Sequence, residues 1–293
     1  MILILSVIMV SIRSTLKRVC FEIIPIGNEL LLGEVLDTNS QWMAKKITEL
    51  GGFVTRITIV GDDVEIISST IQEALKRRPS WIITCGGLGP TYDDKTLAGI
   101  AKATGRELIV NRDAVKMLEE RYRILVEKGV VKDGRLTPTR LKMATLPEGA
   151  IPIQNRVGTA PAVLLKVNDV KIVSLPGVPS EMKDIFEHSL IPLFKEDIGR
   201  IYHSEMFLEV IDIVESKIAP ILDKVLEGKS NIYVKSHPKM VEEGHSRLVI
   251  HIVGWAYTQE EAEEIVKNTS KELIEMIEGQ GGKVVGSYTK EKG

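Results

Sequence analysis

The sequence predicts an α/β protein with a mainly parallel sheet, followed by a small α+β domain. Through the first two thirds of the chain, apolar β-branched runs alternate with segments of helical spacing, which is typical of β-α-β units. Three of the predicted strands end in turns rich in glycine or proline. From about Ile198 the order changes to short strands around two helices, which indicates a second domain with its own core.

The first three strands and their turns follow in chain order. Residues 21–26 form an apolar strand that ends in the glycine-bounded turn 27–33. Residues 37–40 offer caps for a helix that ends at Gly51 and Gly52. Residues 53–60 are strand-like, and the turn 61–63 leads into a helix that closes before Pro79. Residues 81–84 form the third strand, which runs into the glycine-rich segment 86–94 and a further helix opened by Asp93 and Asp94.

The next part of the chain predicts an antiparallel edge on this sheet. Residues 115–128 have helical character, and residues 134–138 resemble a loop. Two apolar runs then flank Asn168-Asp169, the chemistry of a tight hairpin. Residues 175–182 again read as a strand, a sharp turn and a helix start.

The last part predicts a β-α-β-β-α-β order with a capping box from Thr258 to Glu261. Gly279-Gln-Gly-Gly282 formally matches the GxxG of KH domains, but it follows a helix without a basic cluster, which favours a helix C-cap. We expect three regions: an extra N-terminal segment (1–18), the α/β domain (19–197) and the small α+β domain (198–293).

Composition limits the partners. A net charge of −2 and a pI near 6.3 give no general reason to expect nucleic acid. Cys20 and Cys85 lie in or beside apolar runs, which indicates free buried thiols in a reducing cytoplasm. Met1–Val10 is apolar but far shorter than the roughly 20 residues that span a bilayer. We interpret it as an over-extended start or a peripheral segment, with a weak anchor or an extra strand as alternatives, and expect no membrane partner.

The three glycine- or proline-rich junctions, residues 27–33, 86–94 and 176–180, are predicted to share one edge of the sheet. In an open parallel sheet, ligands bind beyond the carboxyl ends of the strands. The amides of Gly86, Gly87 and Gly89 could approach an anion closely, and a helix N-terminus adds partial positive charge. The sequence therefore predicts a site for anionic oxygens at this edge.

Adjacent carboxylates favour a cation at the same place. If Thr91 caps the helix, Asp93 and Asp94 both lie in its first turn, where one carboxylate is explained by the helix dipole but two repel each other. A divalent cation such as Mg²⁺ would relieve the repulsion. Asp62-Asp63 also lies between a glycine and a helix, and capping and function stay equally open there.

Other residue types give weaker signals. Glu29 either contacts a ligand hydroxyl or decorates a turn, and Asn39 and Ser40 are more often caps than ligands. For Lys95, a position facing solvent on the helix is slightly favoured over a contact with phosphate. The five histidines show no metal-ligand spacing.

Together these segments resemble the CinA family in its molybdopterin-binding-like domain. The matching segments are residues 26–33, 37–42, 60–63, 86–94, 143–150, 158–161 and 175–182. The resemblance implies a three-layer α/β fold shared with MoaB and MogA of molybdenum-cofactor synthesis, followed by a KH-like domain. It also implies dimers or trimers.

The resemblance further implies metal-dependent hydrolysis of ADP-ribose, a pyrophosphate cleavage, and similar domains hydrolyse FAD. An essential Asp followed two residues later by Thr matches Asp94 and Thr96, and a second essential Asp falls at Asp62 or Asp63. Leu88 stands where the cofactor-synthesis proteins have Thr, and Asp93 stands where they usually have Arg, which favours a metal-assisted site over their pterin-phosphate site. The chain is too short for the deamidase domain that bacterial CinA proteins carry, so no deamidation is expected.

We therefore expect a metal-dependent pyrophosphatase acting on ADP-ribose or a related dinucleotide. The alternative is a non-catalytic protein that binds molybdopterin or a nucleotide. Asp94 and Asp63 are the expected catalytic residues, with Asp93, Asp94 and Asp62 holding Mg²⁺, Mn²⁺ or Co²⁺. The expected ligand-binding residues are Gly27, Asn28, Glu29, Asn39, Gly86, Gly87, Gly89, Thr91, Thr96, Gly158, Thr159, Pro176, Gly177, Pro179 and Ser180.

Overall fold

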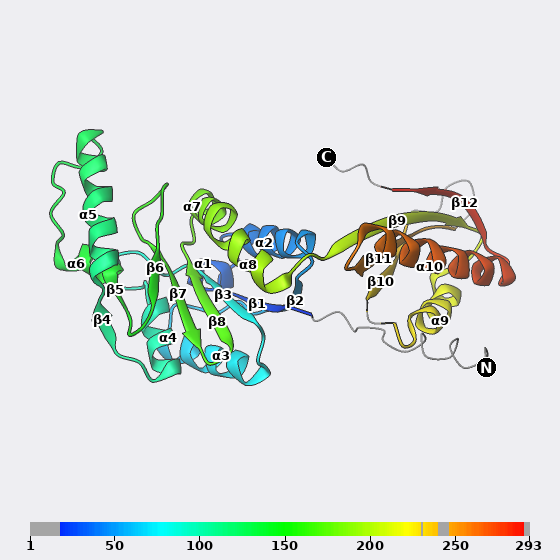
Figure 1. Ribbon diagram of the computed structural model, residues 1–293, viewed down its shortest axis with the longest axis horizontal. Helices are drawn as coiled ribbons and strands as arrows, with labels where there is room; N and C mark the ends of the chain where they lie inside the picture. The colour runs from blue at the N-terminus through cyan, green and yellow to red at the C-terminus, as the bar shows by residue number, and fades with distance from the viewer. Residues whose placement is uncertain (1–17, 230, 240–245, 290–293) are drawn as a thin grey trace, which may run out of the picture. The chain divides into compact units, whose positions relative to one another are not determined.

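The computed structural model describes residues 18–229, 231–239 and 246–289. Apart from Arg18, the extra N-terminal segment predicted for residues 1–18 lies outside the described residues. The chain divides into two compact units, Arg18–Ile198 and the part from Gly199 onward (Figure 1). None of the helices in the described ranges has the length and apolar character needed to cross a membrane.

The main sheet of the first unit is mostly parallel, as predicted. Its strands are β1 (Cys20–Pro25), β2 (Phe53–Ile57), β3 (Trp81–Cys85), β6 (Ile151–Ile153), β7 (Ala162–Val167) and β8 (Val170–Leu175), in the order β2-β1-β3-β8-β7-β6. The β2, β1, β3 and β8 neighbours pair in parallel, whereas β7 and β6 form the predicted antiparallel edge. The hairpin between β7 and β8 turns at Asn168, whose φ is 53°. A separate pair joins β4 (Leu108–Val110) to β5 (Thr145–Pro147).

Helices cover both faces of this sheet and complete a three-layer α/β fold. The helices are α1 (Asn28–Leu31), α2 (Thr38–Glu49), α3 (Val64–Arg77), α4 (Thr96–Thr104), α5 (Arg112–Glu127), α6 (Pro138–Leu141), α7 (Pro179–Ile185) and α8 (Ile191–Ile198), with a 3-10 turn at Lys142–Ala144 and a π turn at Phe186–Leu190. Figure 1 shows α2, α7 and α8 on one side of the sheet and α3 and α4 on the other.

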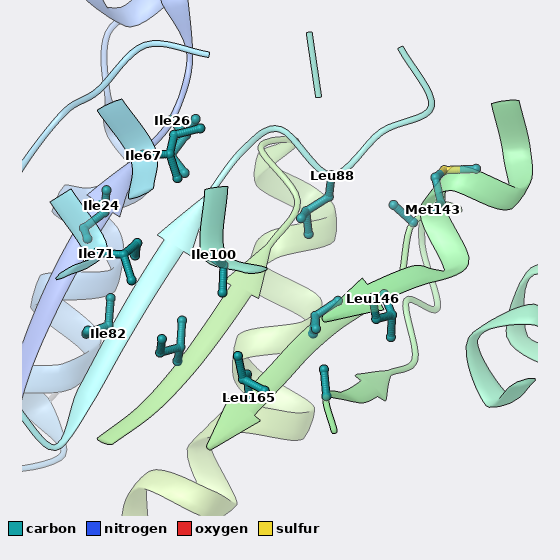
Figure 2. Packing of buried hydrophobic residues seen from close by; sticks show 14 of the residues in the cluster. Ile24, Ile26, Ile67, Ile71, Ile82, Leu88, Ile100, Met143, Leu146 and Leu165 are labelled. Carbon is teal, nitrogen blue, oxygen red and sulfur yellow. The ribbon is translucent and has the colours of Figure 1, made fainter. Parts of the chain in front are cut away.

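The central strands are buried on both faces, which explains their nearly continuous apolar sequence. On the side of α3 and α4, Ile82 packs in one cluster with Ile71 and Ile100 (Figure 2). On the other side, the ring of Trp81 meets Phe194 of α8 edge to face, with centroids 4.7 Å apart. Alternate residues of one strand thus build two different cores.

Two predicted helix starts are confirmed and a third is wrong. Asp37 caps α2 by accepting the Ser40 N–H at 2.9 Å, and Asp63 caps α3. However, α4 begins only at Thr96. Asp93 and Asp94 lie in a turn before the helix, so they do not open it, because hydrogen bonds to Thr91 hold them in that turn.

The second unit has the predicted β-α-β-β-α-β order. Its elements are β9 (Tyr202–Ile211), α9 (Glu215–Leu226), β10 (Ile232–Pro238), β11 (Arg247–Ala256), α10 (Gln259–Gly279) and β12 (Lys283–Tyr288). The strands form an antiparallel sheet in the order β10-β11-β9-β12. This is the arrangement of a ferredoxin-like unit. It does not confirm the KH-like character, which stays a prediction.

The end of α10 agrees with the predicted C-cap. The helix ends at Gly279, and Gly281 follows with a φ of 85°. The Gly282 N–H then donates to the carbonyl oxygen of Ile277 at 3.1 Å. The glycines therefore close the helix backbone.

Candidate functional site

The three predicted junctions meet at one edge of the first unit's sheet. β1, β3 and β8 are parallel neighbours, so the turns that follow them lie side by side. They enclose a cleft of about 440 Å³ that all three junctions line. The predicted common edge is confirmed.

The loop after β3 needs glycine at two consecutive positions. Gly86 has a φ of 112°, and a Cβ there would lie 2.1 Å from the carbonyl oxygen of Ile26. Gly87 has a φ of 65°, and its Cβ would lie 2.4 Å from Thr96 Oγ1. Both positions combine a left-handed backbone with a close approach, so a side chain fits neither.

Thr96 holds this loop in place by two hydrogen bonds. It is fully buried, its hydroxyl donates to the Gly86 carbonyl at 2.7 Å, and its N–H donates to the Gly87 carbonyl at 3.3 Å. Because the hydroxyl is used within the fold, Thr96 positions the loop and does not line the cleft. The Gly86 N–H is also used, on the carbonyl oxygen of Leu175 at 2.9 Å.

Leu88 anchors the same loop in the core. Its side chain is 5% exposed and belongs to the cluster that contains Ile100. Figure 2 shows Leu88 among the core side chains near the end of β3. Burying this side chain fixes the backbone of Gly87 and Gly89 against the cleft.

Asp93 and Asp94 converge on Thr91. Asp94 Oδ2 accepts the Thr91 N–H at 2.7 Å and the Thr91 hydroxyl at 2.6 Å, while Asp93 Oδ1 lies within hydrogen-bonding reach of that same hydroxyl. One hydroxyl carries one proton and can donate to only one of the two carboxylates at a time. The turn therefore concentrates negative charge at the rim of the cleft.

Asp93 stays ionised in this arrangement. The hydrogen bond from Thr91 lowers its pKa most, the Asp93 backbone N–H lowers it further, and the positive charges of Lys142 and Lys95 add to the effect. Lys142 is held in place because its Nζ donates to the Thr91 carbonyl oxygen. The carboxylate is thus available to a cation at neutral pH.

Asp62 and Asp63 have different roles. Asp62 lines the cleft, and its Oδ2 accepts the Asn28 N–H at 2.8 Å, while the Asp62 N–H donates back to Asn28 Oδ1 at 3.2 Å. Asp63 caps α3, accepting the N–H groups of Glu65 at 2.9 Å and Ile66 at 3.0 Å. Of these two residues, only Asp62 faces the site.

The N-terminus of α2 is tied to the loop after β8. Asn39 Nδ2 donates to the Gly177 carbonyl at 2.8 Å and lies 3.5 Å from Cys85 Sγ. Asn39 is therefore a cross-link, since Asp37 supplies the cap that the sequence assigned to this region. Burial raises the pKa of the Cys85 thiol to about 12, so this cysteine is protonated and a poor nucleophile.

Glu181, a carboxylate that was not predicted as a site residue from the sequence, forms another wall of the cleft. Glu181 of α7 lines the cleft and accepts a hydrogen bond from Asn155 Nδ2 at 2.6 Å. A Cβ on Gly158 would lie 1.9 Å from Glu181 Oε2, so this glycine makes room for the carboxylate. The Gly158 N–H donates to Asn155 Oδ1 at 2.7 Å, which holds the loop that carries Thr159.

Most of the predicted site residues line the cleft. Those that do are Gly27, Glu29, Asn39, Asp62, Gly86, Gly87, Gly89, Thr91, Asp93, Asp94, Thr159, Pro176, Gly177 and Pro179. Those that do not are Asn28, Asp63, Thr96, Gly158 and Ser180. The cleft also contains Asp37, Cys85 and Glu181, which the sequence did not single out as ligand contacts. Glu181 could have been found as the carboxylate that follows Pro179 at a helix start.

The carboxylates of the cleft suit a cation that binds together with a phosphate-containing ligand. Within the described ranges, no group of three or more histidine, cysteine, aspartate or glutamate side chains is arranged to hold a metal ion. Asp93 and Asp94 are a pair beside the glycine loop. A pair is sufficient for Mg²⁺, which usually keeps waters and takes the remaining oxygens from substrate phosphates.

Comparison with known proteins agrees with this fold. Residues 22–196 match the family described as "Probable molybdopterin binding domain". A protein of Pyrobaculum arsenaticum is 43% identical over 260 residues, which cover 89% of this chain and 95% of that protein. A protein of Sulfurisphaera tokodaii is 41% identical over 266 residues, 91% of this chain and 98% of that protein.

One solved structure also covers the first unit. The crystal structure of CinA from Thermoplasma acidophilum, a protein of unknown function, superposes with a TM-score of 0.54 at 35% sequence identity, covering 62% of this chain and 98% of that chain. The chain therefore belongs to the molybdopterin-binding-domain family, as a CinA-like member with the MoaB/MogA type of α/β fold.

Proposed function

We propose that this protein is a nucleotide pyrophosphatase that hydrolyses ADP-ribose or a related dinucleotide with the help of a divalent cation. The observation that carries the proposal is the pair Asp93 and Asp94, which converge on Thr91 at the rim of the cleft. Beside them, Gly87 and Gly89 line the same cleft, and neither carries a Cβ that would keep a ligand away from its main-chain N–H. Anion-binding amides next to an acidic pair suit a ligand that contains both phosphate and metal.

In this proposal the loop binds the pyrophosphate and the carboxylates hold the cation. Gly87 and Gly89 face the phosphoryl oxygens, and the N-terminus of α4 behind the loop adds partial positive charge. A cation bound here would neutralise phosphoryl charge and lower the pKa of a water molecule. Asp94 and Asp93 are the residues that would hold it, whereas Asp62, predicted as a further metal ligand, lines the same cleft without forming a group of three with them.

The reaction is a hydrolysis at phosphorus. The oxygen of water forms a bond to one phosphorus atom as the bridging P–O bond breaks, and the bridging oxygen leaves on the other phosphate. The proton of the water passes to a carboxylate oxygen at the rim, where Asp94 lies. Asp62 takes the place predicted for Asp63, because the Asp63 carboxylate is used by two N–H groups of α3.

The second candidate function is binding without turnover. The family description favours a molybdopterin ligand. Its phosphate would use the same glycine loop, and the ring would lie along the wall of Asn39 and Gly177. A protein of this kind would bind its ligand tightly in the cleft and release it unchanged.

Self-association is part of the proposal. Leu31, Leu32 and Leu36 beside the cleft are 59%, 71% and 80% exposed. An exposed apolar group of this kind is typical of a protein–protein contact. A homodimer or homotrimer that covers these side chains would also narrow the mouth of the cleft.

A substrate and metal panel tests the function. Purified protein is incubated with ADP-ribose, FAD or NAD, with Mg²⁺, Mn²⁺, Co²⁺ or EDTA, and the products are separated by chromatography. We expect AMP and ribose 5-phosphate from ADP-ribose with a metal, and no products with EDTA. Tight binding of a pterin or nucleotide without cleavage under any metal would instead establish the second candidate. If the protein neither binds nor cleaves any of these compounds, both candidate functions are excluded.

A further inference from the structure

A second pocket adjoins the cleft at the glycine loop. It has a volume of about 320 Å³, and it shares Gly87, Leu88, Gly89 and Asp94 with the cleft. Its other walls come from α4, β4, α6 and the residues that follow α6. We call it the side pocket. Its size lies in the range that holds small molecules, roughly 300–1,000 Å³.

The walls of the side pocket are mainly apolar. Leu97 of α4 and Leu141 of α6 pack against the core cluster that contains Ile100, so the core holds them in place. Leu108 of β4 is 41% exposed, which leaves apolar surface open to solvent. A ligand that covers this surface removes apolar area from water, which favours binding. The apolar lining consists of Leu88, Leu97, Ala98, Leu108, Pro138 and Leu141.

The polar side chains of the side pocket already have partners within the protein. Lys142 Nζ donates to the Thr91 carbonyl oxygen, and the Thr145 hydroxyl donates to the Leu141 carbonyl oxygen at 3.1 Å. Asp94 Oδ2 accepts two hydrogen bonds from Thr91. A sugar placed here would bury several hydroxyls among few partners, which costs free energy. The side pocket therefore suits a flat ring better than a sugar.

The cleft has the opposite character. Its lining includes the carboxylates of Glu29, Asp37, Asp62, Asp93, Asp94 and Glu181. Carboxylate oxygens only accept hydrogen bonds when ionised, and sugar hydroxyls can donate to them. The cleft therefore suits the ribose of a nucleotide ligand better than its base.

Gly89 and Asp94 lie where the two pockets meet. A Cβ on Gly89 would lie 2.7 Å from Asp94 Oδ2, so the missing side chain lets the carboxylate lie against the loop. Both residues line the cleft and the side pocket. A pyrophosphate bound on the glycine loop beside Asp94 would therefore have one half of its ligand at each pocket.

We propose that the side pocket binds the adenine base of ADP-ribose, while the ribose at the other end of the molecule lies in the cleft. This inference rests on the proposed function, because it needs a ligand whose pyrophosphate lies on the glycine loop. It goes further by giving the base a site of its own and the substrate one orientation. A pterin bound along the wall of Asn39 and Gly177 would leave the side pocket empty, so the two pockets together favour a ligand with two ends.

Photolabelling locates the base directly. The full chain is irradiated with the 8-azido-adenine analogue of ADP-ribose in the presence of Mg²⁺, digested and analysed by mass spectrometry. We expect the label on peptides that contain Leu97, Leu108 or Leu141, and we expect excess ADP-ribose to prevent it. A label on peptides that contain Asn39 or Gly177 would overturn the proposal, because the base would then lie in the cleft. Labelling that excess ADP-ribose does not reduce would also overturn it.

A charge-matched pair on β4 tests the same pocket by affinity. Leu108→Glu puts a carboxylate against the base and is expected to weaken AMP binding about 10-fold or more in calorimetric titration with Mg²⁺. Ile109→Glu makes the same change in charge at the next residue, which is 43% exposed and does not line the side pocket, so it should bind AMP as the wild type does. Melting temperatures show whether both variants are folded. Leu108→Ala, which adds no charge, should weaken binding by a smaller factor.

Two results in this series would contradict the proposal. One is equal AMP affinity in Leu108→Glu and Ile109→Glu, and the other is no binding of AMP to the wild type below about 1 mM. The outcome for hydrolysis is separate. Labelling of the side pocket without cleavage of ADP-ribose would refute the pyrophosphatase and keep this inference, whereas cleavage with the label in the cleft would refute this inference alone.

Discussion

Thr91 determines how two adjacent carboxylates share the rim of the cleft. Its hydroxyl can donate its one proton to either Asp93 or Asp94, and its N–H donates to Asp94. The sequence predicted that two neighbouring carboxylates exceed what helix capping requires. It did not predict that α4 starts at Thr96, because the turn that delays the helix is held by hydrogen bonds of Thr91 to the two carboxylates that capping would have placed inside the helix.

Gly86 is the residue whose replacement should disturb the site most. We expect Gly86→Ala to lower the free energy of unfolding by more than about 2 kcal/mol, because it combines backbone strain with a contact to the Ile26 carbonyl inside the sheet. Gly105→Ala is the matched control: its φ is 63° and a Cβ would meet nothing within 4 Å, so we expect only about 1–2 kcal/mol. Urea unfolding measures both. Equal losses would show that the close approach does not matter.

Cys85 gives a prediction for alkaline pH. Its pKa is about 12 in the folded chain against 9.0 for an ordinary thiol, so between these values the unfolded state binds fewer protons than the folded state. The free energy of unfolding therefore falls as pH rises through this window, by up to about 1.4 kcal/mol per pH unit from this group. Cys85→Ala should show a shallower fall, measured by urea unfolding from pH 9 upward. Cys20 is present in both proteins, and parallel curves would refute the assignment.

At the scale of elements, the strands and their turns were predictable because local signals agree with the fold. The apolar runs of β1, β3 and β8 and the Gly or Pro after each are sufficient to place the cleft at one sheet edge. The hairpin at Asn168 was predictable from its turn chemistry. The wall formed by Glu181 was not, because it depends on Asn155, which lies 26 residues earlier in the chain.

Substitutions at Asp63 distinguish a capping role from a catalytic role. Asp63→Ala should lower the free energy of unfolding by about 0.5–2 kcal/mol, since α3 loses its N-cap, while Asp63→Asn should retain most of the cap. Hydrolysis of ADP-ribose per folded molecule should change little in either variant. Asp62→Asn should instead weaken hydrolysis. A large loss of turnover in Asp63→Asn at unchanged stability would restore its predicted catalytic role.

At the scale of the whole molecule, the two units have separate cores. Ile24, Ile82 and Ile100 belong to one cluster, and Leu208 and Ile250 belong to another. The change of pattern near Ile198 in the sequence corresponds to the place where the chain passes from one unit to the next.

Separate cores predict separate folding. A polypeptide of residues 18–198 should unfold cooperatively and should bind ADP-ribose as the full chain does, because it contains the complete cleft. Near-UV circular dichroism of Trp42 and Trp81 measures folding, and calorimetric titration measures binding. A fragment without cooperative unfolding would show that the first unit depends on the second.

The central claim is that the Asp93–Asp94 pair performs the chemistry of the cleft, and the turnover number for ADP-ribose of Asp94→Asn tests it most directly. We expect a fall of at least about 100-fold at saturating Mg²⁺ with an unchanged melting temperature, by analogy with loss of one preorganised polar group. Asp113→Asn, an exposed carboxylate in the first turn of α5, should retain wild-type turnover. Wild-type turnover in Asp94→Asn would contradict the account.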